Sequence, residues 1–169
     1  PFVFPANNSQ DDIAALKAIA EANPLNSDLR NFISNKDYLK GRGSNDGYNV
    51  GVTWNTESTS RMKSFFINDG RTRTITSMDV SALSGLEQLD LQNTRWKSLD
   101  LSTLTKLRSL RLHGNDSLAW FTVKLPSPLP ENFWIGGNTT IMAGTPVDDY
   151  NAYAAKGEEI DLSVYASVG

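Results

Sequence analysis

The chain has 169 residues, with 16 Lys or Arg and 19 Asp or Glu, so its net charge is −3 at pH 7 and its pI is about 5.1. This length predicts one domain with a core of its own. The chain contains no cysteine and one histidine, which excludes disulfides, iron–sulfur clusters and zinc sites built from Cys or several His. We therefore expect no metal and no cofactor. The acidic charge and the lack of long apolar runs argue against nucleic-acid binding and against membrane insertion.

Residues 1–60 predict two helices followed by a strand. Asn8 or Ser9 is a suitable N-cap for the first helix, and Ser27 is one for the second. Val50–Trp54 has the composition of a strand. The Gly-rich stretch before it lacks the Gly-Lys-Ser/Thr signature of a phosphate-binding loop, so we interpret it as a plain loop. Both helices place apolar residues at helical spacing: Ile13, Leu16, Ile19, Leu29, Phe32 and Ile33.

A 21-residue repeat occupies the middle of the chain. Adding 21 to Asp79 gives Asp100, and the surrounding apolar positions repeat at the same shift. The segment Leu107–Asn115 follows the leucine-rich repeat pattern L-x-x-L-x-L-x-x-N, and Leu86–Thr94 follows it with Thr in place of Asn. Each copy predicts a short strand whose alternate side chains enter the core. The repeated apolar pairs are Met78/Leu99, Val80/Leu101, Leu83/Leu104, Leu86/Leu107, Leu89/Leu110 and Leu91/Leu112.

Weaker copies flank these two repeats. Phe65–Asn68 resembles a first strand, and Phe133–Asn138 aligns with Leu110–Asn115 at a shift of 23, which predicts four coils in all. Because a coil of about 21 residues is short, we expect its outer wall to be extended or 3₁₀ rather than α-helical. In the tail, Val147–Ala155 predicts a short amphipathic helix. Glu158–Ser163 predicts the start of a strand, and we interpret its carboxylates as solvated rather than as a calcium site.

These patterns together predict an α/β solenoid. The expected fold is a short leucine-rich repeat, right-handed coil with a parallel sheet of about four strands, a helical N-terminal cap and a small C-terminal cap. Residues 1–60 form the helical cap and residues 61–141 form the repeats. Residues 142–169 form a C-terminal cap or a junction to a further module, and all three parts belong to a single structural unit.

Residues 61–141 resemble the leucine-rich repeat region of secreted or surface-anchored bacterial proteins, including internalin-like adhesins. The helix around Asp11–Lys17, the strand Val50–Trp54 and the segment Arg61–Phe65 are similar to the N-terminal cap of those proteins. Ala154–Ser163 is similar to the segment that leads into their β-sandwich module. The resemblance implies protein binding, adhesion and an extracellular or bacterial cell-surface location. The chain begins at Pro1 without Met, so we expect either that a leader has been removed or that the sequence was cut for expression.

The side chains between the strand leucines are expected to point outward and to meet any ligand. Neighbouring strands lie about 4.8 Å apart, so aligned outward residues form ladders of touching side chains. The repeat alignment predicts three rows: Ser64, Gln88, Ser109 and Asn132; Phe66, Asp90, Arg111 and Trp134; Asn68, Gln92, His113 and Gly136. From these rows, the candidate ligand-binding residues are Phe66, Gln88, Asp90, Gln92, Arg111, His113, Asn132 and Trp134.

The middle row is the most informative. Phe66 and Trp134 are expected to be exposed anchors on either side of Asp90 and Arg111, a composition typical of interface hot spots. In the alternative interpretation, Arg111 pairs with Asp90 in solvent and Trp134 packs under the loop at residues 126–130. Three other tryptophans sit at core or cap positions of the pattern, and we interpret them as packing residues: Trp54, Trp96 and Trp120.

The leading functional hypothesis is a noncatalytic recognition or adhesion module that binds a protein ligand, from a host or a neighbouring cell surface, on its strand-lined face. One alternative is a carbohydrate-binding surface in which Trp134 and Phe66 are the aromatic platforms and Asn132 and Gln88 are polar neighbours. Another is a structural spacer for an adjoining domain. No catalytic residue is predicted, because no motif places a serine beside His113, and we interpret it as an exposed strand residue.

Overall fold

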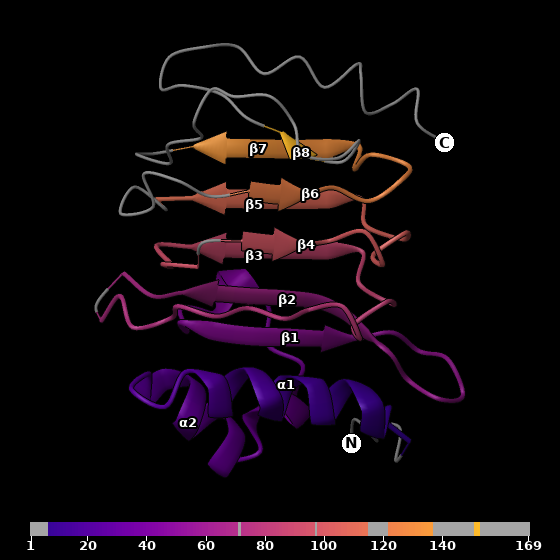
Figure 1. The fold of residues 1–169 in the computed structure, drawn as a ribbon. Helices are drawn as coiled ribbons and strands as arrows, with labels where there is room; N and C mark the ends of the chain where they lie inside the picture. The colour runs from indigo at the N-terminus through magenta and orange to yellow at the C-terminus, as the bar shows by residue number, and fades with distance from the viewer. Residues whose placement is uncertain (1–6, 71, 97, 115–121, 137–150, 153–169) are drawn as a thin grey trace.

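Five strands of one sheet lie one above another in the computed structural model, and two helices lie at the end nearest the N-terminus (Figure 1). The structure describes residues 7–70, 72–96, 98–114, 122–136 and 151–152. The elements are α1 (Gln10–Ala22), α2 (Ser27–Ser34), the 3₁₀ turns η1 (Asp37–Lys40) and η2 (Ser44–Asp46), β1 (Val50–Trp54), β2 (Met62–Asn68), β3 (Gln88–Gln92), β4 (Ser98–Asp100), β5 (Ser109–His113), β6 (Thr122–Lys124), β7 (Asn132–Gly136) and β8 (Asn151–Ala152).

The two helices predicted near the N-terminus are present. Ser9 caps α1 by accepting a hydrogen bond from the backbone N–H of Asp12. The cap of α2 differs from the prediction by one residue, because Asn26, not Ser27, accepts the backbone N–H of Leu29 at 2.8 Å. The amide of Asn26 also donates to Asp69 in the loop after β2. The sequence around residue 26 did not predict a side chain that both caps the helix and contacts a loop far away in the chain.

The carboxylate of Asp12 joins α1 to the start of β2. Asp12 is fully buried, and its Oδ1 accepts Nη2 of Arg61 at 2.8 Å. Its Oδ2 accepts both Nε of Arg61 at 2.9 Å and the backbone N–H of Met62 at 2.8 Å. The hydrogen bond to Asp12 raises the already high pKa of Arg61 further. The carboxylate is therefore shared between a helix and a strand that lie 50 residues apart in the chain.

The large sheet has the strand order β1-β2-β3-β5-β7. Strands β2, β3, β5 and β7 are parallel to one another, and β1 is antiparallel to β2. The shift of 21 is confirmed in the pairing of β3 with β5, where Leu89 faces Leu110 and Leu91 faces Leu112. All four leucines are 1% exposed or less, so one side of these strands belongs to the core.

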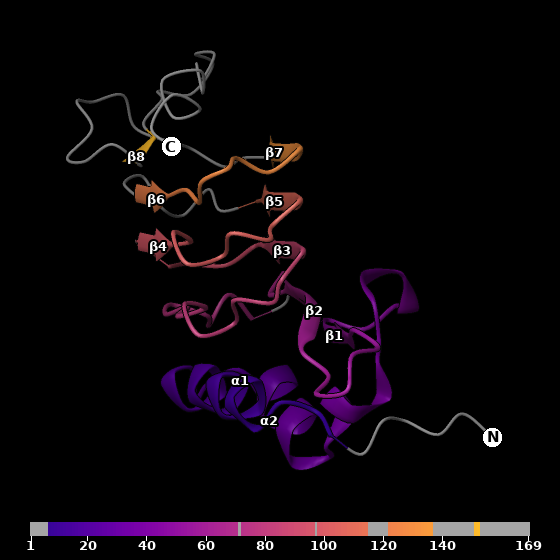
Figure 2. The ribbon, with the colours of Figure 1, turned by 90° about the vertical axis from the view of Figure 1, so that its right-hand side faces the viewer.

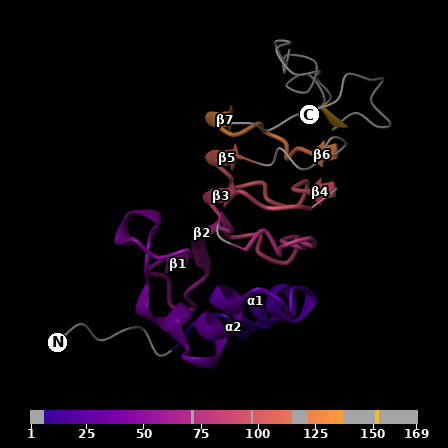
Figure 3. The same cartoon turned by 90° about the vertical axis from the view of Figure 1, so that its left-hand side faces the viewer.

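A second, smaller sheet lies on the other side of the core. Its strand order is β4-β6-β8, with β4 parallel to β6 and β8 antiparallel to β6. Figures 2 and 3 show β4 and β6 in one layer and β3, β5 and β7 in the other. The short strands at β4 and β6 agree with the expectation of an extended outer wall. The leucines of β4 and of the segments that follow β4 and β6 are all buried: Leu99, Leu101, Leu104, Leu107 and Leu125.

The predicted solenoid class is wrong. The sheet is mixed rather than parallel, because the connection from Trp54 to Met62 is shorter than the crossover of about a dozen residues that a parallel pair requires. The sheet has five strands rather than about four. The connections between the parallel strands also differ from one another. The connection from β2 to β3 contains no strand in its described residues, whereas those from β3 to β5 and from β5 to β7 contain β4 and β6. The chain is therefore a small α/β domain with a mixed sheet and two helices, not a stack of like coils.

The expectations for the tail fall mainly outside the described residues. Asn151 and Ala152 form strand β8, so the helix predicted over Val147–Ala155 is wrong at these two positions. The remainder of that segment, the strand predicted over Glu158–Ser163 and the C-terminal cap lie outside the described ranges.

Candidate functional site

The side chains between the core leucines lie on the face of the large sheet that is turned away from β4 and β6, which we call the strand face. The predicted rows are confirmed by the strand register, which aligns Phe66 with Asp90, Asp90 with Arg111 and Arg111 with Trp134. The rows beginning at Ser64 and Asn68 pair in the same way. The register therefore brings all eight candidate residues to one face, but their exposure differs.

Phe66 is not the exposed anchor that the sequence predicts, because only 7% of it is exposed. Its antiparallel partner on β1 is Gly51, and directly opposed residues of such a pair project from the same face. A Cβ added to Gly51 would lie 2.5 Å from the carbonyl oxygen of Arg42, so the backbone at Arg42 and Gly43 crosses the strand face there. The turn η2 follows on the same side of β1 and β2 (Figure 2). The segment before β1 therefore covers Phe66.

Three contacts made by side chains hold this covering segment in place. The guanidinium of Arg42 lies 3.8 Å from the ring centre of Tyr48 and 3.3 Å from a carboxylate oxygen of Asp37. The carboxylate of Asp46 accepts the backbone N–H of Gly43 at 2.7 Å. The cover is built from residues 37–48, which lie 18 to 29 positions before Phe66, and this explains why strand alternation alone predicted exposure.

Trp134 is exposed, in contrast, and 47% of it is accessible to solvent. It therefore does not pack under the loop at residues 126–130. Its ring stacks on the imidazole of His113, with ring centroids 5.1 Å apart and planes inclined by 11°. The guanidinium carbon of Arg111 lies 6.0 Å from the centre of the same ring, at the outer range of cation–π attraction. We call Arg111, His113 and Trp134 the platform.

The stacking of His113 on Trp134 is a diagonal contact. The direct register partner of Trp134 is Arg111, and that of His113 is Gly136, which brings no side chain between the two rings. His113 is half-buried rather than exposed, and its Nδ1 is enclosed without a hydrogen-bond partner among the described residues. Its ring therefore supports the indole and presents no base to solvent at Nδ1.

Asp90 is held within its own strand and does not pair with Arg111. Nε2 of Gln92 donates to both carboxylate oxygens of Asp90, at 3.0 and 3.2 Å. Burial raises the pKa of the half-buried Asp90 carboxyl, although the hydrogen bond from Gln92 and the charge of Arg111 lower it. Within the described ranges no ion pair shorter than 4 Å joins Asp90 to Arg111, so the predicted solvent pair is not found.

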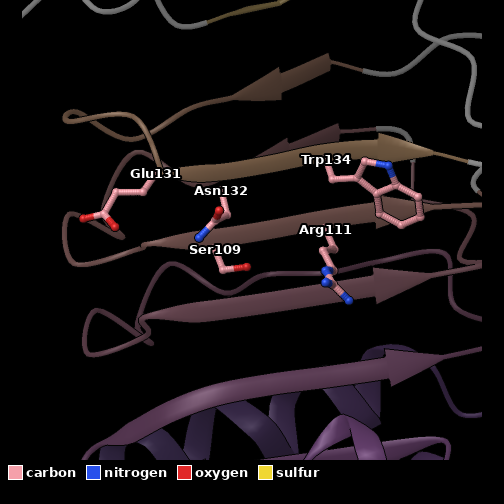
Figure 4. Close-up of a pocket in the computed structure, with 5 residues that line it drawn as sticks. All are labelled: Ser109, Arg111, Glu131, Asn132 and Trp134. Carbon is pink, nitrogen blue, oxygen red and sulfur yellow. The ribbon is translucent and has the colours of Figure 1, made fainter.

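Two adjoining depressions form a groove along the strand face. One, of about 660 Å³, is lined by Ser109, Arg111, Glu131, Asn132 and Trp134 (Figure 4). The other, of about 490 Å³, shares Ser109 and Arg111 and continues past Asp90, Gln88 and Ser64 to Phe66 and η2. Figure 4 shows the Trp134 ring beside Arg111, with Ser109, Asn132 and Glu131 toward the starts of β5 and β7. The groove thus runs across β2, β3, β5 and β7, from the covering segment to the platform.

The residues immediately before the row of Ser64, Gln88, Ser109 and Asn132 form a charged rim that the sequence reasoning missed. Lys63 precedes Ser64 on β2, and its Nζ lies 4.0 Å from the carboxylate of Glu87. Arg108 precedes β5 and lies 3.9 Å from the carboxylate of Glu131. Positive and negative residues alternate at these aligned positions of the sequence, and this alternation could have predicted the rim. Both pairs are largely exposed, so each contributes at most about 1 kcal/mol to stability.

Other chemical centres are not found in the part of the chain that the structure describes. No group of three His, Asp or Glu there is arranged to hold a metal ion, and no helix there is long and apolar enough to cross a membrane. Trp96 is buried, and Nε1 of the partly buried Trp54 donates to the carbonyl of Tyr38, in agreement with packing roles. Trp120 lies outside the described residues.

Comparisons of the chain with protein-family models, with curated proteins and with solved structures found no match. The resemblance to bacterial leucine-rich repeat proteins therefore stays a prediction.

Proposed function

We propose that this chain is a noncatalytic recognition module that binds a protein ligand through an extended segment lying along the groove. The platform is the observation that supports the proposal most directly. It combines an indole with nearly half of its surface accessible and a guanidinium that has no hydrogen bond or ion pair among the described residues. Trp and Arg are the residues that most often dominate the energy of protein interfaces. An adhesive role and a bacterial cell-surface location belong to this proposal through the resemblance alone.

The dimensions of the groove set the size of the segment. From β2 to β7 it spans three strand spacings of about 4.8 Å, which give a length of about 14 Å. An extended peptide advances about 3.3 Å per residue, so about four residues fill the groove. Because the groove crosses the strands, side chains from each of the four parallel strands line it, which is the arrangement expected if the rows determine specificity.

The expected contribution of Trp134 follows from its exposure. A tryptophan buries roughly 150–250 Å² in an interface, and about half of this area remains available here. At about 25 cal/mol per Å², covering that area stabilises a complex by about 2 to 3 kcal/mol. This corresponds to a change in Kd of about 30- to 150-fold.

Selection from a random peptide display library, followed by calorimetry on the selected peptides, tests the proposal. Wild type is expected to bind selected peptides, and Trp134→Ala is expected to lose about 30-fold or more in affinity. Leu25→Ala is the matched control, because Leu25 is an apolar residue 77% exposed but outside the groove. Circular dichroism and urea unfolding confirm that each variant is folded. Peptide affinities that are equal for wild type and Trp134→Ala would refute the assignment of the platform.

The carbohydrate alternative makes a different prediction with the same variants. It was based on two exposed aromatic platforms, and the burial of Phe66 leaves only Trp134. For this reason we favour the protein ligand. A glycan array probed with wild type and Trp134→Ala distinguishes the two, since binding to glycans but to no peptide would favour the sugar-binding surface.

A further inference from the structure

We infer that the bound segment carries one carboxylate side chain that pairs with Arg111, next to an apolar side chain that lies on Trp134. This inference rests on the proposed function and specifies the chemistry of the partner.

Four charged side chains line the groove: Asp46, Asp90, Arg111 and Glu131. The three carboxylates have partners within the chain. Asp46 accepts the backbone N–H of Gly43, Asp90 accepts the amide of Gln92, and Glu131 faces Arg108 at 3.9 Å. Among the described groove residues, Arg111 alone is a charged group with neither a hydrogen bond nor an ion pair. A ligand carboxylate is the complementary group for this position.

The geometry of Arg111 suits a carboxylate better than a generic acceptor. A guanidinium presents its N–H groups in a planar fork, which binds both oxygens of a carboxylate in parallel. The cation–π contact leaves the Arg111 guanidinium beside the Trp134 ring, so a carboxylate on the fork places its neighbouring side chain close to the indole. Asp90 on β3 is the register partner of Arg111 in this row. Both of its carboxylate oxygens accept hydrogen bonds from Gln92 rather than from Arg111.

The other acids limit how acidic the ligand is. Asp46 at one end of the groove and Glu131 near the other repel additional negative charges. We therefore expect a single acidic residue at one position of the segment, and no preference for a run of acids.

The experiment uses peptides selected on the wild-type chain, with affinities measured by calorimetry. A selected peptide and its Glu→Gln or Asp→Asn version are each titrated into wild type, Arg111→Gln and Arg111→Lys. On wild type the neutral peptide is expected to bind about 10-fold more weakly, and on Arg111→Gln the two peptides are expected to bind equally. Arg111→Lys is expected to restore only part of the difference, because an ammonium does not form the parallel pair of bonds. Raising the NaCl concentration is expected to weaken only the acidic peptide.

Arg108→Gln is the matched control. Arg108 lies three residues before Arg111 and also carries an exposed positive charge, but it is on the rim and already faces Glu131. Its loss is expected to change the affinity less than threefold and to leave the preference for the acidic peptide intact. A charge reversal completes the design, since Arg111→Glu is expected to prefer the version of the peptide in which the acid is replaced by Lys.

Three outcomes overturn the inference in distinguishable ways. Peptides that depend on Trp134 but show no acidic position, or whose acid is insensitive to Arg111, refute the inference and leave the proposed function standing. Failure to select any peptide that depends on Trp134 refutes both. Binding to acidic glycans without binding to peptides refutes the peptide as the occupant, although it retains the role of Arg111 in recognising a carboxylate.

Discussion

Replacing Asp12 by Asn tests whether one buried carboxylate fastens the helical end of the domain to the sheet. Three donors point at this side chain: Nε and Nη2 of Arg61 and the backbone N–H of Met62. Asn has the same shape but only one acceptor oxygen. Whichever way the new amide is turned, its NH₂ group faces at least one of these donors and a hydrogen bond is lost.

The magnitude follows from the type of contact that is broken. Hydrogen bonds to charged groups contribute about 1.5 to 3 kcal/mol each, and breaking a buried ion pair costs about 3 to 5 kcal/mol. The Arg61 side chain is 32% exposed, so water takes over part of its solvation. We therefore expect Asp12→Asn to lower the free energy of unfolding by about 2 to 4 kcal/mol, and the Tm by about 5 to 15 °C for a chain of this size.

Urea unfolding followed by tryptophan fluorescence and by circular dichroism measures this change. The midpoint is expected to fall with no change in the m-value if the variant still unfolds in one step. Asp11→Asn is the matched control, because Asp11 is an exposed acid in the same helical turn. This substitution removes only the interaction of the carboxylate with the helix dipole, which is about 0.3 to 1 kcal/mol. A loss for Asp12→Asn no larger than that for Asp11→Asn would refute the reasoning.

Three further predictions concern the core, a glycine turn and pH. Leu89→Ala is expected to lower the free energy of unfolding in urea by about 2 to 5 kcal/mol, and Leu25→Ala by no more than about 0.5 kcal/mol; equal losses would contradict the assigned core. Gly114→Ala and Gly47→Ala both place a Cβ at positive φ, at a cost of about 1 to 2 kcal/mol, but only at Gly114 would the new atom lie 2.1 Å from a side-chain oxygen. Urea unfolding is therefore expected to show the larger loss for Gly114→Ala. Because the folded pKa of Asp90 is raised, its ionised form opposes folding at neutral pH, and protonation removes this effect as the pH falls through the folded pKa. Asp90→Asn is thus expected to be more stable than wild type at pH 7, with a gain that shrinks toward acid pH in urea titrations, and a gain independent of pH would contradict the cause assigned.

The register of the parallel strands was predictable because it depends on local periodicity. The shift of 21 aligned Leu89 with Leu110 and Leu91 with Leu112, and the structure pairs them so. A one-residue slip would turn these leucines to solvent, so burial excludes it, and the repeat alignment selects this pairing among the registers that keep the leucines buried. The same alternation placed Arg111 and Trp134 side by side on the strand face.

Features that depend on distant segments were not predictable in this way. Phe66 is covered by backbone that reaches it only because Gly51 has no Cβ, and no periodic signal marks that contact. The antiparallel β1 follows from the short connection before Met62, which the repeat pattern does not include. The stacking of His113 on Trp134 is diagonal and depends on which side chains leave room for it.

The alternation of buried and outward-facing residues along β5 has an evolutionary consequence. Its buried leucines alternate with side chains that contribute little to the core, so the outward set can change without disturbing the buried set. Exchanging the residues at positions 109, 111 and 113 would give the domain a new preference in its partner at little expense to folding. Relatives of this chain would then keep their leucines fixed while these positions diverge with the molecules they recognise.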